Sequence, residues 1–160
     1  MENGVFMKKF AFAFLVIGVI FSMAVCDNGG GGSSGNDNTD TSFDGTWIHS
    51  GVDSGELTLN RGNYNYPGIS RGTYRTNDNS ITFTPTHVHG AFWQGSLDMT
   101  RYYTRDEAKA AMMLLLPENP GYTEADIDGF VDLGFVEFSG TLSADGNTLI
   151  IPGTGSFTKR

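Results

Sequence analysis

Two histidines separated by one residue, His87 and His89, are the side chains whose type and spacing most directly suggest chemistry. Residues two apart on a β-strand point to the same face, so these imidazoles could share one zinc or copper ion. A further ligand would be needed, and His49 or one of many acidic residues would have to supply it. Because paired histidines beside a strand turn are more often exposed to solvent, the sequence predicts no metal site and leaves His87 and His89 as candidates only.

Acidic residues gather between positions 118 and 132, where they suggest a calcium-binding loop. Asp126 and Asp128 have the spacing of the first two ligands of an EF-hand. That loop needs a third ligand at its fifth position and a glycine at its sixth, whereas Gly129 and Phe130 occupy positions four and five here. We therefore interpret this segment as the solvated face of a helix.

Motifs of nucleophilic or nucleotide-dependent catalysis are absent from the sequence. There is no Gly-X-Ser-X-Gly pattern, no phosphate-binding loop and no dinucleotide-binding glycine pattern. The spacing of the acidic residues singles out no pair of carboxylates. We therefore expect no enzyme activity, no catalytic residue and no cofactor.

Eight aromatic side chains between residues 64 and 103 are the remaining candidates for a binding site. Tyrosine suits a pocket because it combines an apolar body with a polar tip. An eight-stranded barrel is just wide enough either to be filled by side chains or to hold one small ligand. Either these aromatics form the core, or six of them line a ligand site: Tyr64, Tyr66, Tyr74, Phe83, Trp93 and Tyr102.

The elements that would position these residues are short strands. From Phe43 onward, apolar and polar residues alternate in runs cut by Gly, Asn and Asp, as in all-β domains. Gly90 and Gly95 are candidate bulges or barrel corners in the longest run. Hairpins between sequence neighbours predict an antiparallel up-and-down barrel, which leaves no exposed sheet edge. The eight predicted strands cover residues 45–50, 55–60, 64–66, 69–76, 81–86, 88–103, 135–142 and 149–159.

Residues 104–133 interrupt this pattern with helical spacing. Thr104 and Glu107 fit a capping box, and Pro117 ends the first helix. A second helix begins at Thr123, with Gly134 as its C-terminal cap. We therefore expect a helical hairpin between strands six and seven, with its apolar faces buried against the barrel.

The first 25 residues have the organisation of an export signal. Lys8 and Lys9 precede an apolar run over residues 10–21, which is short for a membrane-spanning helix. The tetrapeptide ending at Cys26, Met-Ala-Val-Cys, resembles the lipobox of bacterial lipoproteins. Cleavage after Ala24 is the alternative and would release a soluble protein.

Cys26 is the chain's single cysteine and cannot form a disulfide within it, so lipidation supplies its role. Residues 26–42 contain this cysteine followed by a stretch rich in Gly, Ser, Asn and Asp. That stretch has too few apolar side chains to fold and predicts a flexible linker with a reach of about 20–24 Å. The predicted organisation is a signal peptide over residues 1–25, a lipidated linker over 26–42 and one domain over 43–160.

The net charge of that domain limits the classes of molecule it can bind. Residues 43–160 contain 8 basic and 14 acidic side chains, a net charge of −6. A domain this acidic lacks the basic face that nucleic acids or anionic lipid headgroups require. We expect a monomeric domain in the bacterial cell envelope, anchored by its lipid and facing the periplasm or the cell surface. A soluble periplasmic or secreted protein is the alternative.

The start of the first predicted strand, Gly45-Thr46-Trp47, resembles the Gly-X-Trp signature of lipocalin-like (calycin) domains. The strand rhythm of residues 43–160 outside the helical insert is similar to such domains in small bacterial lipoproteins. The resemblance implies an eight-stranded barrel that in some members holds a small hydrophobic ligand. It also implies that Trp47 packs at the closed end against a basic side chain, Lys159 or Arg160. The helical insert departs from the family pattern, in which the helix follows strand eight.

The sequence thus leaves two functions open for a membrane-anchored lipoprotein. One is the binding of a small hydrophobic or amphipathic ligand in the barrel or beneath the helices. The other is a structural or protein-interaction role, inhibitor-like or envelope-associated, with a barrel filled by its own side chains. An internal cavity lined by the aromatics would favour the first function.

Overall fold

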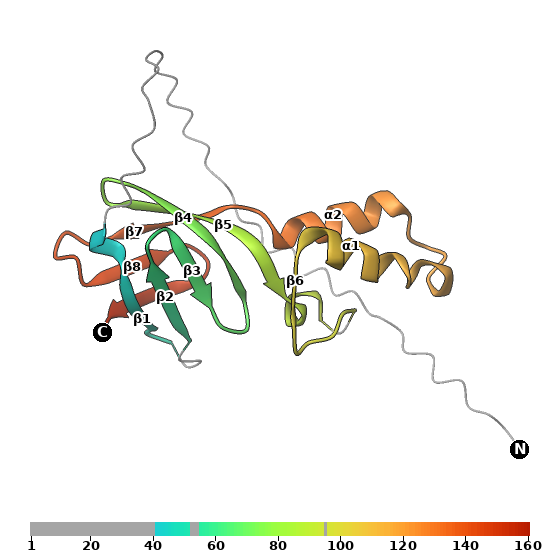
Figure 1. The fold of residues 1–160 in the computed structure, drawn as a ribbon, viewed down its shortest axis with the longest axis horizontal. Coiled ribbons are helices and arrows are strands. Elements are labelled where there is room, and N and C mark those ends of the chain that lie inside the picture. The colour runs from blue at the N-terminus through green and yellow to red at the C-terminus, as the bar shows by residue number, and fades with distance from the viewer. Residues whose placement is uncertain (1–40, 52–54, 95) are drawn as a thin grey trace, which may run out of the picture. The chain divides into compact units, whose positions relative to one another are not determined.

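The computed structural model describes residues 41–51, 55–94 and 96–160. The predicted signal peptide, Cys26 and the linker up to residue 40 lie outside these residues. Figure 1 shows strands gathered around a barrel and two helices beyond one end of it. The strands are β1 (Gly45–His49), β2 (Glu56–Asn60), β3 (Asn63–Tyr66), β4 (Ser70–Asn77), β5 (Ser80–His89), β6 (Tyr102–Tyr103), β7 (Phe138–Leu142), β8 (Thr148–Ile151) and β9 (Gly155–Lys159).

Eight of these strands close a ring. Each of β1, β2, β3, β4, β5, β7, β8 and β9 pairs antiparallel with the next in that order, and β9 pairs with β1. The short β6 pairs only with the last two residues of β5 and stays outside the ring. The predicted antiparallel up-and-down barrel, with a helical hairpin between β6 and β7, is confirmed.

Two of the eight predicted strands differ from the structure. Residues 88–103 form no barrel strand, because the chain leaves β5 at His89, makes a 3₁₀ turn (η2, Gly90–Trp93) and folds back on itself. A side chain at Gly90 would lie 2.8 Å from the carbonyl carbon of Asp98, so this fold-back requires glycine. Residues 149–159 contain two strands, β8 and β9, because Pro152 and Gly153, at φ 79°, form a turn between them.

One end of the barrel is built around Trp47. A 3₁₀ turn (η1, Thr41–Phe43) places Phe43 in the core, and the Trp47 indole N–H donates to the Phe43 carbonyl at 2.9 Å. Lys159, the register partner of Trp47, holds its Nζ 5.3 Å from the Trp47 ring centroid and donates to the Ser42 carbonyl. Lys159 is therefore the basic side chain beside Trp47, as expected, and the folded domain includes Ser42.

A bulge in β5 separates the barrel from the helical part. Gly72 of β4 faces Pro85 and Arg71 faces His87, so Thr86 is an extra residue without a register partner. The bulge reverses the alternation of buried residues: Phe83 points into the barrel core, whereas Val88 belongs to a second core. Strand β5 thus contributes side chains to two hydrophobic clusters.

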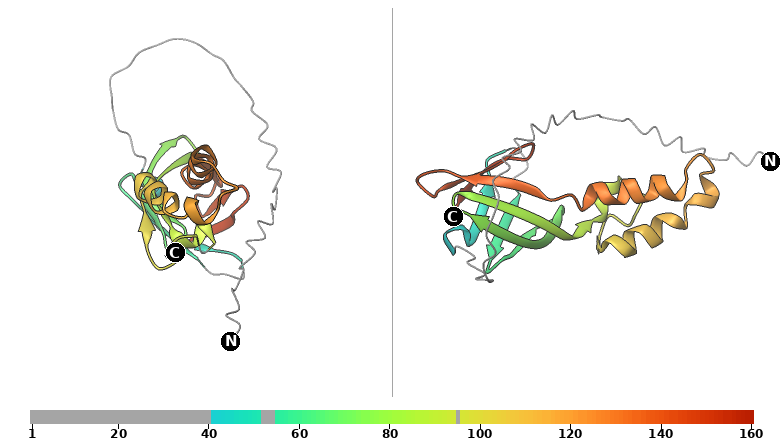
Figure 2. Two further views of the ribbon diagram at one scale, coloured as in Figure 1. Left: turned by 90° about the vertical axis from the view of Figure 1, so that its right-hand side faces the viewer. Right: turned by 90° about the horizontal axis from the view of Figure 1, so that it is seen from above.

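The helices are α1 (Arg105–Met113) and α2 (Glu124–Gly134), connected through a 3₁₀ turn (η3, Leu116–Glu118). Both begin where expected: α1 has the predicted capping box at Thr104, and α2 has a second capping box at Thr123. Figure 2 shows the hairpin they form beyond the end of the barrel, continuing the direction of β5. The expectation that the hairpin covers the barrel is therefore wrong.

The apolar faces of the helices are buried in their own core. They pack against each other and against η2, β6 and the end of β5, because the bulge turns Val88 toward them. Two ion-pair sets on the surface connect the helices: Arg105 with Asp132, and Lys109 with both Glu124 and Asp128. The second core consists of Val88, Trp93, Leu97, Tyr103, Ala108, Met112 and Val131.

Candidate functional site

The barrel interior is filled by side chains. Trp47, Phe83 and Phe157 have no exposed surface. A void that admits a water molecule would expose the side chains that line it, so these residues border no such void. Aromatic contacts occupy the centre, with ring centroids 5.1 Å apart for Tyr64 and Phe83 and 4.7 Å apart for Phe83 and Phe138. The residues around Phe83 therefore offer no preformed space for a ligand.

The six aromatics predicted as ligand contacts do not share one site. Tyr64, Tyr74 and Phe83 lie together in the barrel core, and Tyr66 packs at its edge. Trp93 is 1% exposed in the second core. Tyr102 lies outside both, between the His89 ring and the Arg71 guanidinium, with centroid distances of 5.0 and 5.1 Å.

Polar groups in the barrel core are paired rather than available for chemistry. The Tyr64 hydroxyl forms a 3.0 Å hydrogen bond with the buried Ser70 hydroxyl. Burial raises the pKa of Tyr64 to about 12, because the tyrosinate form would lose its hydration. The Tyr74 hydroxyl donates to Asp44, whose carboxylate also accepts from the Arg61 backbone N–H. The two bonds to Asp44 attach the β2–β3 turn to the segment that precedes β1.

The histidine pair has structural partners. The His87 Nδ1 lies 3.0 Å from the Thr86 hydroxyl, and the His89 Nδ1 accepts from the Ala91 N–H at the start of η2. His49 lies on β1, where its Nε2 donates to the Thr154 carbonyl at 3.0 Å. Among the described residues, no three His, Cys, Asp or Glu side chains are arranged to hold a metal ion.

Carboxylates of the helical hairpin cap and join its helices. Hydrogen bonds from Thr104 lower the pKa of Glu107, and those from Thr123 lower the pKa of Asp126. The hydrogen bond from Arg105 likewise lowers the pKa of Asp132. The acidic segment is thus a set of helix caps and interhelical ion pairs on a solvated surface.

The hairpin also carries exposed apolar side chains. Leu114 is 79% exposed at its tip, Tyr122 is 44% exposed on the returning chain, and Leu133 is 63% exposed near its base. Sequence reasoning missed the tip, although residues 112–116 read Met-Met-Leu-Leu-Leu. One face of a helix cannot bury five consecutive apolar residues, so this run could have predicted exposed apolar side chains at the tip.

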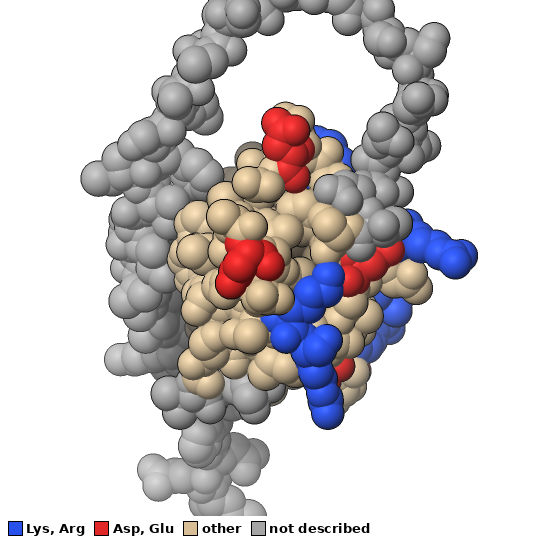
Figure 3. Space-filling model, turned by 90° about the vertical axis from the view of Figure 1, so that its left-hand side faces the viewer, with Lys and Arg blue, Asp and Glu red and all other residues tan. Residues whose placement is uncertain are grey.

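Charge is distributed unevenly between the hairpin and the barrel. Residues 104–134 contain two basic and seven acidic side chains, a net charge of −5, which leaves −1 for the rest of residues 43–160. Basic and acidic side chains are mixed on the barrel end that faces away from the hairpin (Figure 3). The negative charge therefore accompanies the exposed apolar tip rather than the barrel.

No helix among the described residues combines the length and the apolarity that crossing a bilayer requires. Comparison of the chain with protein-family models, with curated proteins and with solved structures found no match. The fold and its surfaces therefore carry the functional argument.

Proposed function

We propose that this chain is a membrane-anchored lipoprotein of the bacterial cell envelope that binds another protein through its helical hairpin. The barrel serves as the rigid support. The observation that carries the proposal is the contrast between a barrel with no exposed interior side chains and a hairpin that exposes Leu114 at its tip. Exposed apolar residues rimmed by charge are typical of protein-interaction sites.

The anchor follows from the N-terminal sequence. Cys26 carries the lipid after removal of residues 1–25, and the linker holds the domain off the membrane surface. Replacing Cys26 with alanine should move the protein from the detergent-rich to the aqueous phase in a phase-partition assay. An unchanged partition would contradict the lipid anchor while leaving the hairpin's role intact.

The partner's chemistry follows from the hairpin. Its net charge of −5 repels anionic headgroups and favours a protein groove that is apolar at its centre and basic at its rim. The shared core of Ala108, Met112 and Val131 holds the two helices in a fixed arrangement, which lowers the entropic cost of docking. The proposed partner is therefore a basic-rimmed envelope protein rather than the membrane itself.

The ligand-binding alternative has less support. A ligand in the barrel would have to displace Phe83 or Phe157, and one beneath the helices would have to displace Trp93 or Met112. All four side chains are at most 1% exposed. Opening either core would cost several kcal/mol before any ligand contact formed.

Site-specific photo-crosslinking in cells of the source organism tests the proposal. A benzophenone side chain at Leu114 should give one discrete protein adduct, whereas the same group at Ile150, a half-exposed apolar residue of β8, should not. Adding Leu115→Asp should abolish the adduct. Absence of a protein adduct at Leu114, or adducts with lipid alone, would contradict the proposal. So would native mass spectrometry that finds a stoichiometric apolar molecule in the purified full-length protein.

A further inference from the structure

A polar depression lies on the outer wall of the barrel, away from the hairpin tip. It has a volume of about 420 Å³ and is open to solvent. Its floor is backbone, because Tyr64 buries its side chain in the barrel and Gly72 has none. Its polar side chains come from β3, β4 and β5: Asn63, Asn65, Arg71, Thr73, Thr86 and His87.

Strand register arranges these side chains in rows. Asn65 of β3 is the partner of Arg71 on β4, which in turn faces His87 on β5. Asn63 and Thr73 form the next row along the same strands. Neighbouring strands lie about 4.8 Å apart, so each row spans roughly 10 Å. The β5 bulge adds the Thr86 hydroxyl between the two rows.

Arg71 supplies a positive charge that no acidic side chain in residues 41–51, 55–94 and 96–160 neutralises by an ion pair. The other outward-facing arginine of β4, Arg75, pairs with Glu137 at 3.0 Å, and Arg101 and Arg105 also pair with acidic side chains. Arg71 instead lies over the Tyr102 ring, at 5.1 Å from its centroid. The Tyr102 hydroxyl accepts from the Gly68 N–H, which fixes this ring.

We propose that this depression binds a carboxylate-bearing saccharide, with the carboxylate on Arg71 and the sugar hydroxyls on the asparagine and threonine side chains. The guanidinium fork matches a carboxylate with two hydrogen bonds, and His87 adds a polar contact beside it. Amide and hydroxyl side chains both donate and accept, as sugar hydroxyls do. Apart from the buried Tyr64 and Gly72, every lining residue carries an amide, hydroxyl, guanidinium or imidazole group, which suits a polar ligand lying on the surface.

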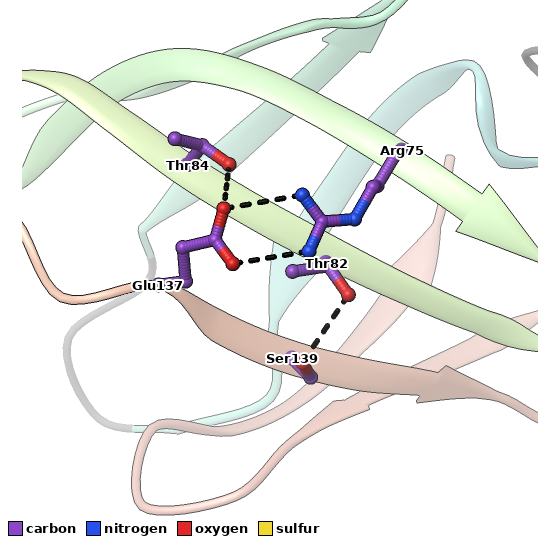
Figure 4. Close-up of polar contacts among 5 residues, drawn as sticks. All are labelled: Arg75, Thr82, Thr84, Glu137 and Ser139. Carbon is purple, nitrogen blue, oxygen red and sulfur yellow. Dashed lines mark hydrogen bonds and ion pairs between the residues drawn. The ribbon is translucent and has the colours of Figure 1, made fainter.

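Arg75, farther along β4 on the same wall, is an arginine whose charge is neutralised by an ion pair. Both guanidinium nitrogens of Arg75 donate to Glu137, which also accepts from Thr84 at 2.6 Å (Figure 4). Thr82 and Ser139 continue this row across β5 and β7. Arg75 thus shares strand, face and exposure with Arg71 and differs in having a carboxylate partner, which makes it the matched control.

Calorimetric titration of the full-length protein in detergent tests this site independently of the hairpin's role. Trigalacturonate is the probe, with galactotriose as its neutral counterpart and inorganic phosphate as a simple anion. Trigalacturonate should bind at least about tenfold more tightly than either control. Arg71→Gln should weaken its binding at least about tenfold, Asn65→Ala should weaken it less, and Arg75→Gln should leave it unchanged.

Three outcomes would overturn the proposal. They are no trigalacturonate binding at millimolar concentration, equal binding of phosphate or galactotriose, and equal loss in the Arg71 and Arg75 variants. Circular dichroism spectra that match wild type would exclude misfolding as the cause of a loss. Backbone amide shifts at Asn65 and Thr86 in NMR spectra would then locate the bound saccharide, and shifts confined to other strands would count against the site.

Discussion

Gly72 occupies the tightest backbone contact beside the β5 bulge, and its replacement by alanine is the sharpest test of the fold. A Cβ at this position would lie 2.8 Å from the Thr86 nitrogen, 3.0 Å from the Pro85 Cα and closer still to the Thr84 carbonyl oxygen. All three atoms belong to the backbone, so no side-chain rotation can relieve the overlap. The strands β4 and β5 would have to separate by roughly 1 Å.

The cost follows from the hydrogen bonds at this point. A separation of about 1 Å takes N–H···O distances from about 2.9 Å to beyond 3.5 Å, so about two ladder bonds around the bulge would be lost. Each backbone group left unpaired costs about 1–3 kcal/mol. Gly72→Ala should therefore lower the free energy of unfolding by roughly 2–5 kcal/mol, a large share of the 5–15 kcal/mol typical of a domain.

Gly129→Ala is the matched control for this substitution. Gly129 lies within α2, and a Cβ there would have no neighbour within 4 Å. Alanine is favoured over glycine inside a helix, so this variant should be more stable than wild type by about 0.5–1 kcal/mol. Urea unfolding of both variants, followed by tryptophan fluorescence, measures the two effects. A Gly72→Ala variant within about 0.5 kcal/mol of wild type would refute the reasoning.

Three further predictions concern the cores and their titratable groups. Burial raises the pKa of Tyr64 to about 12 from about 10 in the unfolded chain, so the folded state holds this proton more tightly and its contribution is complete below about pH 10. That contribution, about 2–3 kcal/mol, should disappear as the pH rises toward 12 in urea-unfolding series, and Tyr64→Phe should reduce this pH dependence, leaving the part due to groups such as Tyr66 and Lys109, whose pKa values are also raised. Met112→Ala opens the second core and should cost about 2–5 kcal/mol in thermal unfolding followed at 222 nm; a cost below 1 kcal/mol would mean that this core is loosely packed. The carboxyls of Glu107, Asp126 and Asp132 have lowered pKa values, so their stabilisation is present above about pH 4–5 and is lost as the pH falls through their folded pKa values. Helical ellipticity should decline in that acidic range and not between pH 6 and 8, where a decline would contradict the assignment.

Local sequence patterns determined much of the fold. Alternation predicted most barrel strands, the Asp145-Gly146 turn predicted the hairpin of β7 and β8, and the capping box at Thr104 and the start at Thr123 marked where the helices begin. These features depend on residues within a few positions of one another, so a single sequence contains them. The pairing of Lys159 with Trp47 was reachable only through the family resemblance, because the two residues are far apart in the chain.

The candidate sites were less accessible to sequence reasoning. Tyr64, Tyr74 and Phe83 were predicted as ligand contacts and lie together in the packed core, because composition cannot distinguish a residue that lines a cavity from one that fills it. Tyr102 was predicted as a ligand contact, whereas its ring packs against the Arg71 guanidinium. The Asn65–Arg71–His87 row depends on the register of three strands, and no spacing within one strand encodes it.

The sequence by itself determined an all-β chain with a helical insert, acidic overall, with one cysteine after an apolar N-terminal run. Only the tertiary structure decided that side chains fill the barrel interior and that the helices pack around a separate hydrophobic core. The physical reason is the bulge at Thr86, where β5 has one residue more than β4 and the Gly72 backbone lies close to residues 84–86. Because of this extra residue, Val88 points away from the barrel core. A one-residue change of register moves every side chain that follows to the other face of the sheet, and that register is determined by the contact between two strands.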